Sequence, residues 1–588
     1  MTSTVISNRS KKPEVYTDSK YDFLYPHVDD PNFNVKIAQK KEFSETQYDG
    51  HIDTEMTIEE QAEKMCKSDF ELAPHQLFVR NFLSFNTPYN SLLLYHGLGT
   101  GKTCSAITIA EEMREYLNQL GVSQRILVVA SPNVQDNFKM QLFDESKLEL
   151  ENGFWKMNTC VGYKLLREVN PTNMKNMDRR KIVSQIRRII AGSYLFLGYR
   201  EFNTWVTNKL TPVNAVSMSE GQVKNYQNEQ IQKLFNNRLV VIDEVHNIRI
   251  TEETSVDNKR VAQALTKLAE VASNMRLLLL SATPMFNNYK EIVWLLNLMN
   301  VNDKRPPVDI KDIFDKQGNF KLGKDGAEVG KQTLIRKMTG YISFVRGENP
   351  FTFPYRIFPT QFAPDKSILN GRYPTKALNG KGIIQPLEKL DIFSNKIGSF
   401  QEEVYYYIIN NLKKNSAAGL KKTFENMDTF GYNELQYPIE ALNMTYPLKD
   451  FTRLSKGTST HELIGKGGLR RVMTFTDTKS EKCDFEYDPG TLANFGRIFS
   501  PDQIHKYSSK IGSVVDNVQN TSGISIIYSQ YIDGGIIPLA LALEELGFRR
   551  YGEVKSLFKE APSKKMEGPT PKYIIISGEK NLSPNNMQ

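Results

Sequence analysis

Short, uninterrupted apolar runs recur along the first half of the chain, separated by stretches with helical periodicity. The runs occupy residues 92–95, 126–130, 194–197, 239–242 and 277–280. Four or five consecutive apolar residues bounded by polar ones are typical of strands buried on both faces of a parallel sheet. The pattern therefore predicts a complete, doubly wound parallel α/β domain over residues 61–300.

The pattern changes on either side of this domain. Residues 1–60 are polar, contain three prolines and show no helical period, which predicts an extended N-terminal arm. Residues 301–485 have few long apolar runs, several prolines and Gly-rich turns, which predicts a linker and an inserted α-rich region. A second, partial α/β domain is predicted for residues 486–588, with apolar strands at 524–529 and 573–577.

A glycine-rich segment follows the first apolar run. It consists of His96, Gly97, Leu98, Gly99, Thr100, Gly101, Lys102 and Thr103. Between a strand and a helix, such a loop wraps phosphates with its N–H groups, while Lys102 adds a charge and Thr103 a hydroxyl for Mg²⁺. The general P-loop pattern has Gly where this chain has His96, so an ordinary Gly-rich loop is the alternative at this point. The favoured interpretation is an ATP site.

Two carboxylates end the run at 239–242. Asp243 and Glu244 follow a predicted parallel strand, and the carboxyl ends of such strands are where open α/β sheets bind ligands. In an ATP site Asp243 would hold Mg²⁺ together with Thr103, and Glu244 would orient the attacking water. A solvated acidic turn would also explain the pair, but it would leave the glycine-rich loop unexplained.

Small hydroxylated residues follow the last apolar run, namely Ser281, Ala282 and Thr283. In this order, Gly-x-Gly-Lys-Thr, Asp-Glu-x-His and Ser-Ala-Thr resemble the motifs of superfamily 2 helicases and translocases. The resemblance implies RecA-like domains, the second one partial, and ATP hydrolysis with Lys102, Asp243 and Glu244 as catalytic residues. It also implies that His246 and the Ser-Ala-Thr segment couple the nucleotide state to nucleic acid.

The same resemblance assigns roles to three further segments. Gln76, preceded by Pro74 and His75, would read the adenine edge, although a lone Gln is also compatible with a surface position. The residues after two of the predicted strands would touch the nucleic-acid backbone. They are Ser131, Pro132, Gly198 and Tyr199. Each of these junctions is equally compatible with an ordinary α/β connection.

The segments flanking the motifs narrow the resemblance. Residues 74–83, 86–90 and 341–359 look like the SNF2-like helicases of nucleocytoplasmic large DNA viruses. That group includes relatives of the poxvirus early transcription factor small subunit and of nucleoside triphosphate phosphohydrolase I. A member would act on DNA in viral transcription, with a viral RNA polymerase or an early transcription factor subunit as partner. It would be located in a virion or a cytoplasmic viral factory.

Composition limits the other possibilities. The 588 residues exceed what one core holds, and 40% hydrophobic and 24% charged residues are ordinary for soluble globular domains. A net charge of +8 permits binding to nucleic-acid phosphates without requiring it. There is neither a long apolar run nor a signal-peptide core in the sequence, so we expect a soluble intracellular protein that does not bind or span a membrane and is not secreted.

The cysteines are far apart in the sequence, at Cys66, Cys104, Cys160 and Cys483. Their spacing argues against a zinc ribbon and for a reducing compartment. Cys104 directly follows Thr103, where it is either an oxidisable thiol or a small buried helix residue.

Two segments of superfamily 2 enzymes have no counterpart in this sequence, a Gly-Asp-type segment and a Gln-x-x-Gly-Arg-x-x-Arg segment with two arginines. Because those arginines reach the γ-phosphate, we expect this chain alone to bind ATP yet hydrolyse it poorly, as a truncated product or half enzyme. Two hypotheses stay open. The chain is either an ATP-dependent nucleic-acid helicase or translocase, or a non-catalytic ATP- and DNA-binding subunit of a transcription complex. A P-loop kinase fits less well, since it has no use for the Ser-Ala-Thr segment.

Overall fold

The computed structural model divides the chain into two compact units, residues 1–355 and residues 356–588. The residues it describes are 24–48, 55–67, 71–121, 124–157, 159–172, 174–248, 256–285, 289–315, 318–345, 357–369, 373–377, 380–383, 390–414, 432–448, 459–552, 555–560, 562 and 570–583. All the motif residues identified in the sequence lie in the first unit.

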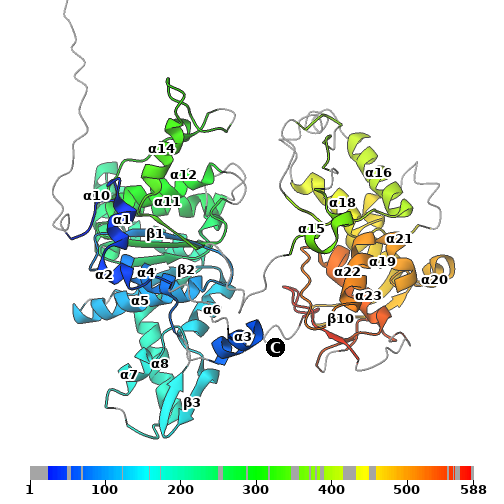
Figure 1. The fold of residues 1–588 in the computed structure, drawn as a ribbon, viewed down its shortest axis with the longest axis horizontal. Helices are drawn as coiled ribbons and strands as arrows, with labels where there is room; N and C mark the ends of the chain where they lie inside the picture. Colours follow the sequence, from blue (N-terminus) through cyan, green and yellow to red (C-terminus); the bar gives the residue numbers. More distant parts are fainter. Residues whose placement is uncertain are drawn as a thin grey trace, which may run out of the picture. The chain divides into compact units, whose positions relative to one another are not determined.

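The first unit is built on a six-stranded sheet in the order β5-β2-β6-β7-β1-β8, and all neighbouring strands are parallel (Figure 1). The strands are β1 (Ser91–His96), β2 (Ile126–Val129), β5 (Tyr194–Leu197), β6 (Leu239–Ile242), β7 (Arg276–Ser281) and β8 (Ile342–Val345). The five strands predicted from apolar runs are all present. Their side chains alternate between two cores, since Leu92 and Leu94 enter one and Leu93 enters the other.

Helices cover both faces of this sheet, as the predicted doubly wound α/β fold requires (Figure 1). One core is formed with α1 (Phe33–Ala38), α2 (Lys41–Ser44), α4 (Pro74–Phe82), α5 (Lys102–Gln119), α6 (Pro132–Leu142), α7 (Lys164–Val169) and α8 (Arg179–Ser193). The other is formed with α9 (Tyr199–Leu210), α10 (Glu220–Phe235), α11 (Val256–Val271), α12 (Glu291–Asn302), α13 (Ile310–Ile313) and α14 (Val329–Met338). The remaining elements of the unit are α3 (Ile58–Lys67), the hairpin β3 (Leu148–Glu151) and β4 (Phe154–Met157), and the 3₁₀ turns η1 (Glu145–Lys147), η2 (Ala215–Ser217) and η3 (Val245–Asn247).

The sheet extends beyond the domain boundary expected at residue 300. β8 lies outside that boundary and pairs with β1 from Leu93 opposite Ile342 to His96 opposite Val345. The sequence pattern there indicated a linker, because β8 is an edge strand and its Phe344 is 58% exposed. An edge strand has one free side and therefore lacks the continuous burial that marks the inner strands.

The described N-terminal residues form packed helices and differ from an extended arm. Phe33 of α1 and Phe43 of α2 are buried against aromatic rings of α4, Phe82 and Phe78. The hydroxyl of Tyr89 also donates a hydrogen bond to the Pro26 carbonyl at 2.8 Å. This segment is part of the first core, and it was missed because short helices with single aromatic anchors leave little periodicity.

The second unit is mainly helical. Its helices are α15 (Pro359–Phe362), α16 (Ser399–Lys414), α18 (Tyr432–Asn443), α19 (Gly465–Val472), α20 (Pro489–Phe495), α21 (Pro501–Tyr507), α22 (Ser509–Gln519) and α23 (Ile537–Leu546), with the turns η4 (Pro364–Lys366), η7 (Thr460–Glu462) and the π-helical η8 (Ile532–Ile536). Its strands form two short pairs, β9 (Met473–Asp477) with β10 (Lys482–Tyr487) and β11 (Arg549–Arg550) with β12 (Lys572–Tyr573).

The strand predicted at 524–529 is not formed. Ile524 and Ile526 are 96% and 94% exposed, and the segment pairs with no other part of the chain that the structure describes. Of the strand predicted at 573–577 only β12 forms at its start, and Ile574 and Ile576 beyond it are exposed. The apolar pattern reports strand propensity, whereas a strand also needs neighbours along its edges, which are set by residues far away in the chain.

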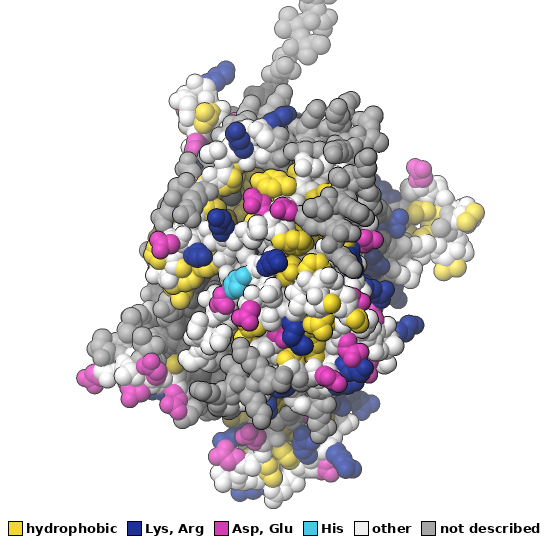
Figure 2. Space-filling view, turned by 90° about the vertical axis from the view of Figure 1, so that its right-hand side faces the viewer, with side chains coloured by type: hydrophobic (Ala, Val, Ile, Leu, Met, Phe, Trp, Pro, Cys, Tyr) yellow, Lys and Arg dark blue, Asp and Glu magenta, His cyan; other side chains and the backbone are white. Residues whose placement is uncertain are grey.

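Surface charge on the face shown in Figure 2 is mixed. Lys and Arg side chains are interspersed there with Asp and Glu and with hydrophobic side chains. The net charge of +8 is therefore not gathered into a single basic stripe on this face. No helix within the described ranges is both long and apolar enough to cross a membrane.

Candidate nucleotide and coupling site

The motif residues converge at one edge of the first sheet. All six strands are parallel, so the segments that follow them emerge on the same side. This edge carries the glycine-rich loop after β1, Ser131 and Pro132 after β2, Gly198 and Tyr199 after β5, Asp243 and Glu244 after β6, and Ser281 to Thr283 at the end of β7. Segments separated by up to some two hundred residues thus form one site.

The glycine-rich loop takes a backbone shape that depends on its glycines. Gly99 and Gly101 have φ angles of +76° and +75°, in the left-handed region that favours glycine. At Gly101 a Cβ atom would also lie 2.4 Å from Nε2 of Gln76. Inside the loop the Thr100 hydroxyl donates to the Gly97 carbonyl at 2.8 Å. The loop is therefore held closely against α4 with its backbone turned to the sheet edge.

Helix α5 starts at the end of this loop and presents its N-terminus to the site. Its first intrahelical bond runs from the Ser105 N–H to the Gly101 carbonyl, which leaves the N–H groups of the first turn available to an anion. Lys102 Nζ lies 3.0 Å from the His96 carbonyl and 3.1 Å from the Gly97 carbonyl. Burial lowers the pKa of Lys102, and the charges of Glu244 and Asp243 act in the opposite direction.

Gln76 supports the loop with both ends of its amide. Its Oε1 accepts from the Ala73 N–H at 2.9 Å, and its Nε2 donates to the Gly101 carbonyl at 3.2 Å. It is only 5% exposed, so the alternative of a surface Gln does not hold. The adenine contact expected for Gln76 stays a prediction.

His75 and Tyr48 add a contact that sequence reasoning missed. The His75 Nε2 lies 2.8 Å from the Thr100 carbonyl, and its Nδ1 lies 2.6 Å from the Tyr48 hydroxyl. Because a carbonyl can only accept, Nε2 carries the proton and Nδ1 accepts from Tyr48. Burial lowers the pKa of His75, which favours this neutral form. Nothing in the polar sequence around Tyr48 distinguished it.

His96, the residue that departs from the general loop pattern, is a buried structural group. It is fully buried, and its Nε2 lies 2.9 Å from the Ser343 hydroxyl on β8. Burial lowers the pKa of His96 to about 3, with the charges of His75 and Lys102 adding to the effect. The imidazole is therefore neutral, and its hydrogen bond to Ser343 links the edge strand β8 to the end of β1.

The carboxylate pair at the end of β6 combines burial with a strained turn. Asp243 is 7% exposed, and its Oδ1 accepts the Glu244 N–H at 2.8 Å. Burial raises the pKa of Asp243 to about 6, with the negative charge of Glu244 contributing. Glu244 has a φ of +47°, which is uncommon for a non-glycine residue and costs about 1–3 kcal/mol. Such strain is concentrated at functional sites.

Three of the predicted coupling residues lie next to each other. His246 Nδ1 is 3.0 Å from the Ser281 hydroxyl and 3.3 Å from Glu244 Oε2. The Ser281 Oγ also accepts the Thr283 N–H at 3.0 Å. A chain of polar contacts thus links the carboxylates after β6 to the small residues at the end of β7.

The two loops predicted to touch nucleic acid follow the neighbouring strands β2 and β5, and each leads into a helix. Ser131 is the N-cap residue of α6, and Gly198 is that of α9. The Tyr199 hydroxyl, however, donates to the Asp243 carbonyl at 2.8 Å, which places this residue beside the carboxylates. Tyr199 therefore supports the nucleotide side of the site, a contact that sequence reasoning did not anticipate. A contact of these loops with nucleic acid stays a prediction.

The donor set suits a magnesium ion bound together with phosphates. Thr103 offers a hydroxyl and Asp243 a carboxylate, both hard oxygen ligands, and Mg²⁺ takes few protein ligands when phosphates and waters supply the rest. Within the described residues no cluster of three or more His, Cys, Asp or Glu side chains could hold a metal by itself. The raised pKa of Asp243 marks a buried carboxyl whose charged form a cation would stabilise.

A cavity of about 650 Å³ lies beside α4 and the edge strand β8. It is lined by α1, α4 and β8 and by Tyr48 and His75. Its walls are thus mostly apolar and aromatic, and they border the same histidine that contacts Thr100.

Fold and site together define a helicase-like α/β domain, with a glycine-rich loop after β1 and a carboxylate pair after β6. More particularly, residues 75–342 match the family model described as the SNF2-related domain. The match ends in β8, which agrees with the structural extent of the sheet.

Viral proteins are among the relatives. A candidate ATP-dependent RNA helicase of Acanthamoeba polyphaga mimivirus is 26% identical over 347 residues, 57% of this chain and 28% of that protein. A candidate helicase of Invertebrate iridescent virus 3 is 23% identical over 581 residues, covering 97% of this chain and 45% of the relative. The early transcription factor large subunit homologue of African swine fever virus is 25% identical over 413 residues, 57% of this chain and 35% of the relative.

The chain spans less than half the length of these relatives. The segments flanking the motifs had pointed to a group that includes relatives of the small subunit of the poxvirus factor, whereas the African swine fever virus relative carries the name of a large subunit homologue. Among solved structures, the SWI2/SNF2 ATPase core domain of Sulfolobus solfataricus is 13% identical, covers 82% of this chain and 71% of that one, and has a TM-score of 0.28.

Proposed function

We propose that this chain is an ATP-binding and ATP-hydrolysing protein of the helicase and translocase type that acts on nucleic acid. The observation that carries the proposal is the continuous contact from the carboxylates to the Ser-Ala-Thr segment. His246 Nδ1 lies within hydrogen-bond distance of the Ser281 hydroxyl and within ion-pair distance of Glu244. A domain that only stored a nucleotide would have no use for a polar link leading away from the phosphate site.

In this proposal the glycine-rich loop and the first turn of α5 bind the phosphates. Lys102 exchanges its two carbonyl partners for phosphate oxygens, and the helix N-terminus offers N–H donors. Thr103 and Asp243 hold Mg²⁺, which offsets the phosphate charge. Glu244 orients the attacking water, and Tyr199 keeps the Asp243 backbone in place.

The coupling residues transmit the nucleotide state. A change in the position of the Glu244 carboxylate alters its contact with His246. A shift of the His246 ring then alters the hydrogen bond to Ser281 at the end of β7. The loops at Ser131 and Gly198 lie at the same edge, which makes them the candidate contacts to the nucleic-acid backbone. The substrate in this proposal is DNA.

The viral relatives suggest the biological setting of this proposal, and the name of the early transcription factor relative supports a role in viral transcription. The proposed partner is a viral polymerase or an early transcription factor subunit, and the proposed location is a virion or a cytoplasmic viral factory. A second candidate is a non-catalytic subunit that binds ATP and DNA in a transcription complex, which the early transcription factor relative favours.

The test compares nucleotide binding and phosphate release in the wild type, Lys102→Ala and Glu244→Gln, without nucleic acid and with duplex DNA, single-stranded DNA or RNA. We expect Lys102→Ala to weaken binding at least about tenfold and Glu244→Gln to keep binding while slowing turnover about a hundredfold or more. Lys209→Ala, an exposed lysine on α9, is the matched control. Equal turnover in all variants would exclude catalysis at this site, and binding without any turnover would favour the non-catalytic subunit.

A further inference from the structure

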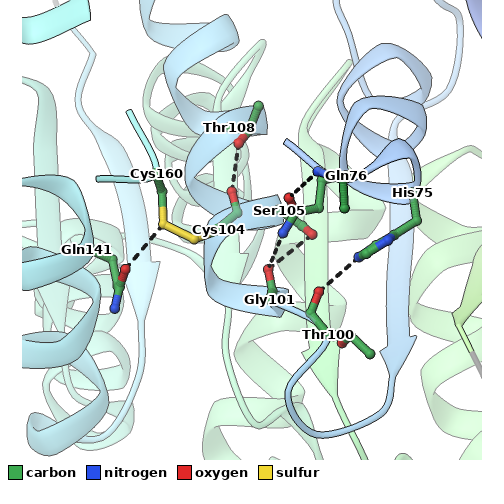
Figure 3. The surroundings of a disulfide bond; sticks show 10 residues. His75, Gln76, Thr100, Gly101, Cys104, Ser105, Thr108, Gln141 and Cys160 are labelled. Carbon is green, nitrogen blue, oxygen red and sulfur yellow. Dashed lines mark hydrogen bonds between the residues drawn. A yellow bond between two sulfur atoms is a disulfide. The ribbon is translucent and has the colours of Figure 1, made fainter. Parts of the chain in front are cut away.

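Two cysteines meet directly beside the nucleotide-binding loop. Cys104 is the third residue of α5, and Cys160 lies in the turn between β4 and α7. They are separated by 56 positions in sequence, and the structure joins them in a disulfide (Figure 3). The sequence spacing had argued for a reducing compartment, and it left Cys104 as either an oxidisable thiol or a small buried helix residue. Since spatial proximity depends on the fold, spacing alone could not reveal this pair.

The surroundings of the pair accommodate both redox states. Cys160 is 6% exposed, and its sulfur lies 3.3 Å from Oε1 of Gln141 on α6 (Figure 3). A disulfide sulfur has no proton to donate, whereas a thiol can donate to this oxygen. After reduction the Cys160 thiol can therefore donate a hydrogen bond to Gln141 Oε1, so burial of the thiol does not leave its proton without an acceptor.

Cys104 is placed for exchange with a small oxidant. It is only partly buried and lies in the first turn of α5, where the helix N-terminus stabilises a thiolate. Its thiolate attacks a low-molecular-weight disulfide, RSSR, and one RSH leaves. The Cys160 thiolate then attacks the Cys104 sulfur of the mixed disulfide and releases the second RSH. Two cysteine thiols are thereby oxidised while one RSSR is reduced to two RSH.

The bond acts on the part of the helix that the proposed function assigns to phosphate binding. Cys104 directly follows Lys102 and Thr103, and the carbonyl of Cys104 accepts from the Thr108 hydroxyl at 2.7 Å. On the other side of the same turn, Gln76 holds the Gly101 carbonyl at 3.2 Å. The disulfide thus restrains the start of α5 in addition to the Gln76 hydrogen bond, on the side of the helix opposite to α4 (Figure 3).

We propose that the Cys104–Cys160 pair is a redox-sensitive site that sets nucleotide affinity, with the oxidised form binding more tightly. The bond fixes the first turn of α5 before the nucleotide arrives, so less ordering remains to be done on binding. In the reduced form the Cys160 thiol donates to Gln141, and the first turn of α5 loses its covalent link to the segment between β4 and α7 while it keeps its hydrogen bond to Gln76. This inference rests on the proposed nucleotide site.

The test uses the full chain in two states, reduced with a phosphine or equilibrated with oxidised glutathione. Mass spectrometry after thiol alkylation reports the Cys104–Cys160 linkage, and titration with a fluorescent methylanthraniloyl ADP and Mg²⁺ reports affinity. We expect about threefold to tenfold tighter binding by the oxidised wild type. Cys160→Ser should bind like the reduced wild type in both conditions. Cys483→Ser, which removes a buried free cysteine of the second unit, should respond like the wild type.

Absence of the linkage at every glutathione ratio would overturn the proposal, and so would a linkage that leaves affinity unchanged. Amide hydrogen exchange over residues 102–108 supplies a readout that needs no nucleotide, with stronger protection expected in the oxidised form. If the ADP analogue binds in neither state, the nucleotide site itself is refuted. In that case equal amide hydrogen exchange over residues 102–108 in the oxidised and reduced protein would also refute an effect of the disulfide on α5.

Discussion

Gly101 is the residue on which the shape of the nucleotide loop depends most. Its φ of +75° disfavours any side chain, and a Cβ would displace the Gln76 amide that holds the loop. We expect Gly101→Ala to weaken nucleotide binding more than about tenfold and to lower the free energy of unfolding by about 1–3 kcal/mol. Fluorescent ADP titration and urea unfolding measure the two effects. Gly121→Ala is the control, because its φ is +66° but no atom lies within 4 Å. It should lose stability and keep affinity.

The buried His96 makes the stability of the first unit depend on pH. Burial lowers its pKa in the folded protein to about 3, while an unfolded histidine titrates near 6.5. The unfolded state therefore binds the extra proton, and the stabilisation present above about pH 6.5 is lost as the pH falls, by about 1.4 kcal/mol per unit. Urea unfolding between pH 7 and pH 5 measures this slope. His96→Asn should flatten it, and an unchanged slope in that variant would show that other groups dominate. His27→Gln, at an exposed position, is the control for removing a histidine.

At the scale of elements, the contact between η3 and β7 is the physical link in the proposed function. We expect His246→Ala and Ser281→Ala to be coupled by about 1 kcal/mol in a double-mutant cycle of unfolding free energies, because their side chains lie 3.0 Å apart. Each variant should still bind the ADP analogue, and whatever stimulation of turnover DNA gives in the wild type should be smaller in each variant. The pair His246→Ala and Thr204→Ala, the latter on α9, should be additive. Additivity of the first pair would mean that the contact carries no energy.

The elements also show what a sequence pattern can predict and what it cannot. The inner strands of the first sheet were predictable because burial on both faces makes their residues continuously apolar, as in Leu239–Ile242. β8 was not, since an edge strand is only half buried. The segment 524–529 is also rich in strand-forming residues, yet Ile524 and Ile526 are exposed. Its pairing depends on distant residues, which local pattern does not encode.

The residues of the candidate site also fall into a group that the sequence predicts and a group that it does not. Gly101, Lys102 and Asp243 were identified because phosphate and metal chemistry demands those residue types in a fixed order along the chain. The contact of Tyr48 with His75, by contrast, joins residues that have no motif in common. Likewise the Cys104–Cys160 pair could only be seen once the turn after β4 was placed against α5. Motifs thus predicted the groups expected to touch the ligand, while the supporting contacts required the fold.

At the scale of the whole molecule, the residues of the candidate nucleotide site all belong to the first of the two units, residues 1–355. Every motif residue, the helices on both faces of the sheet and all six strands lie in that range. We expect a fragment of residues 1–355 to fold by itself and to bind the ADP analogue within about threefold of the full chain, as an independent domain should. Circular dichroism, cooperative urea unfolding and ADP titration measure this.

A shorter fragment, residues 1–300, serves as the comparison for residues 1–355. It ends at the boundary that the apolar pattern suggested. It lacks β8 and therefore leaves the edge of β1 unpaired, and it removes Ser343 from the buried His96 and Tyr341 from the second core. A sheet edge exposed in this way and a buried imidazole without its partner both destabilise the fold. The shorter fragment should unfold at lower urea concentration or aggregate. Equal stability of the two fragments would show that β8 is dispensable and that the unit ends where the sequence pattern placed its boundary.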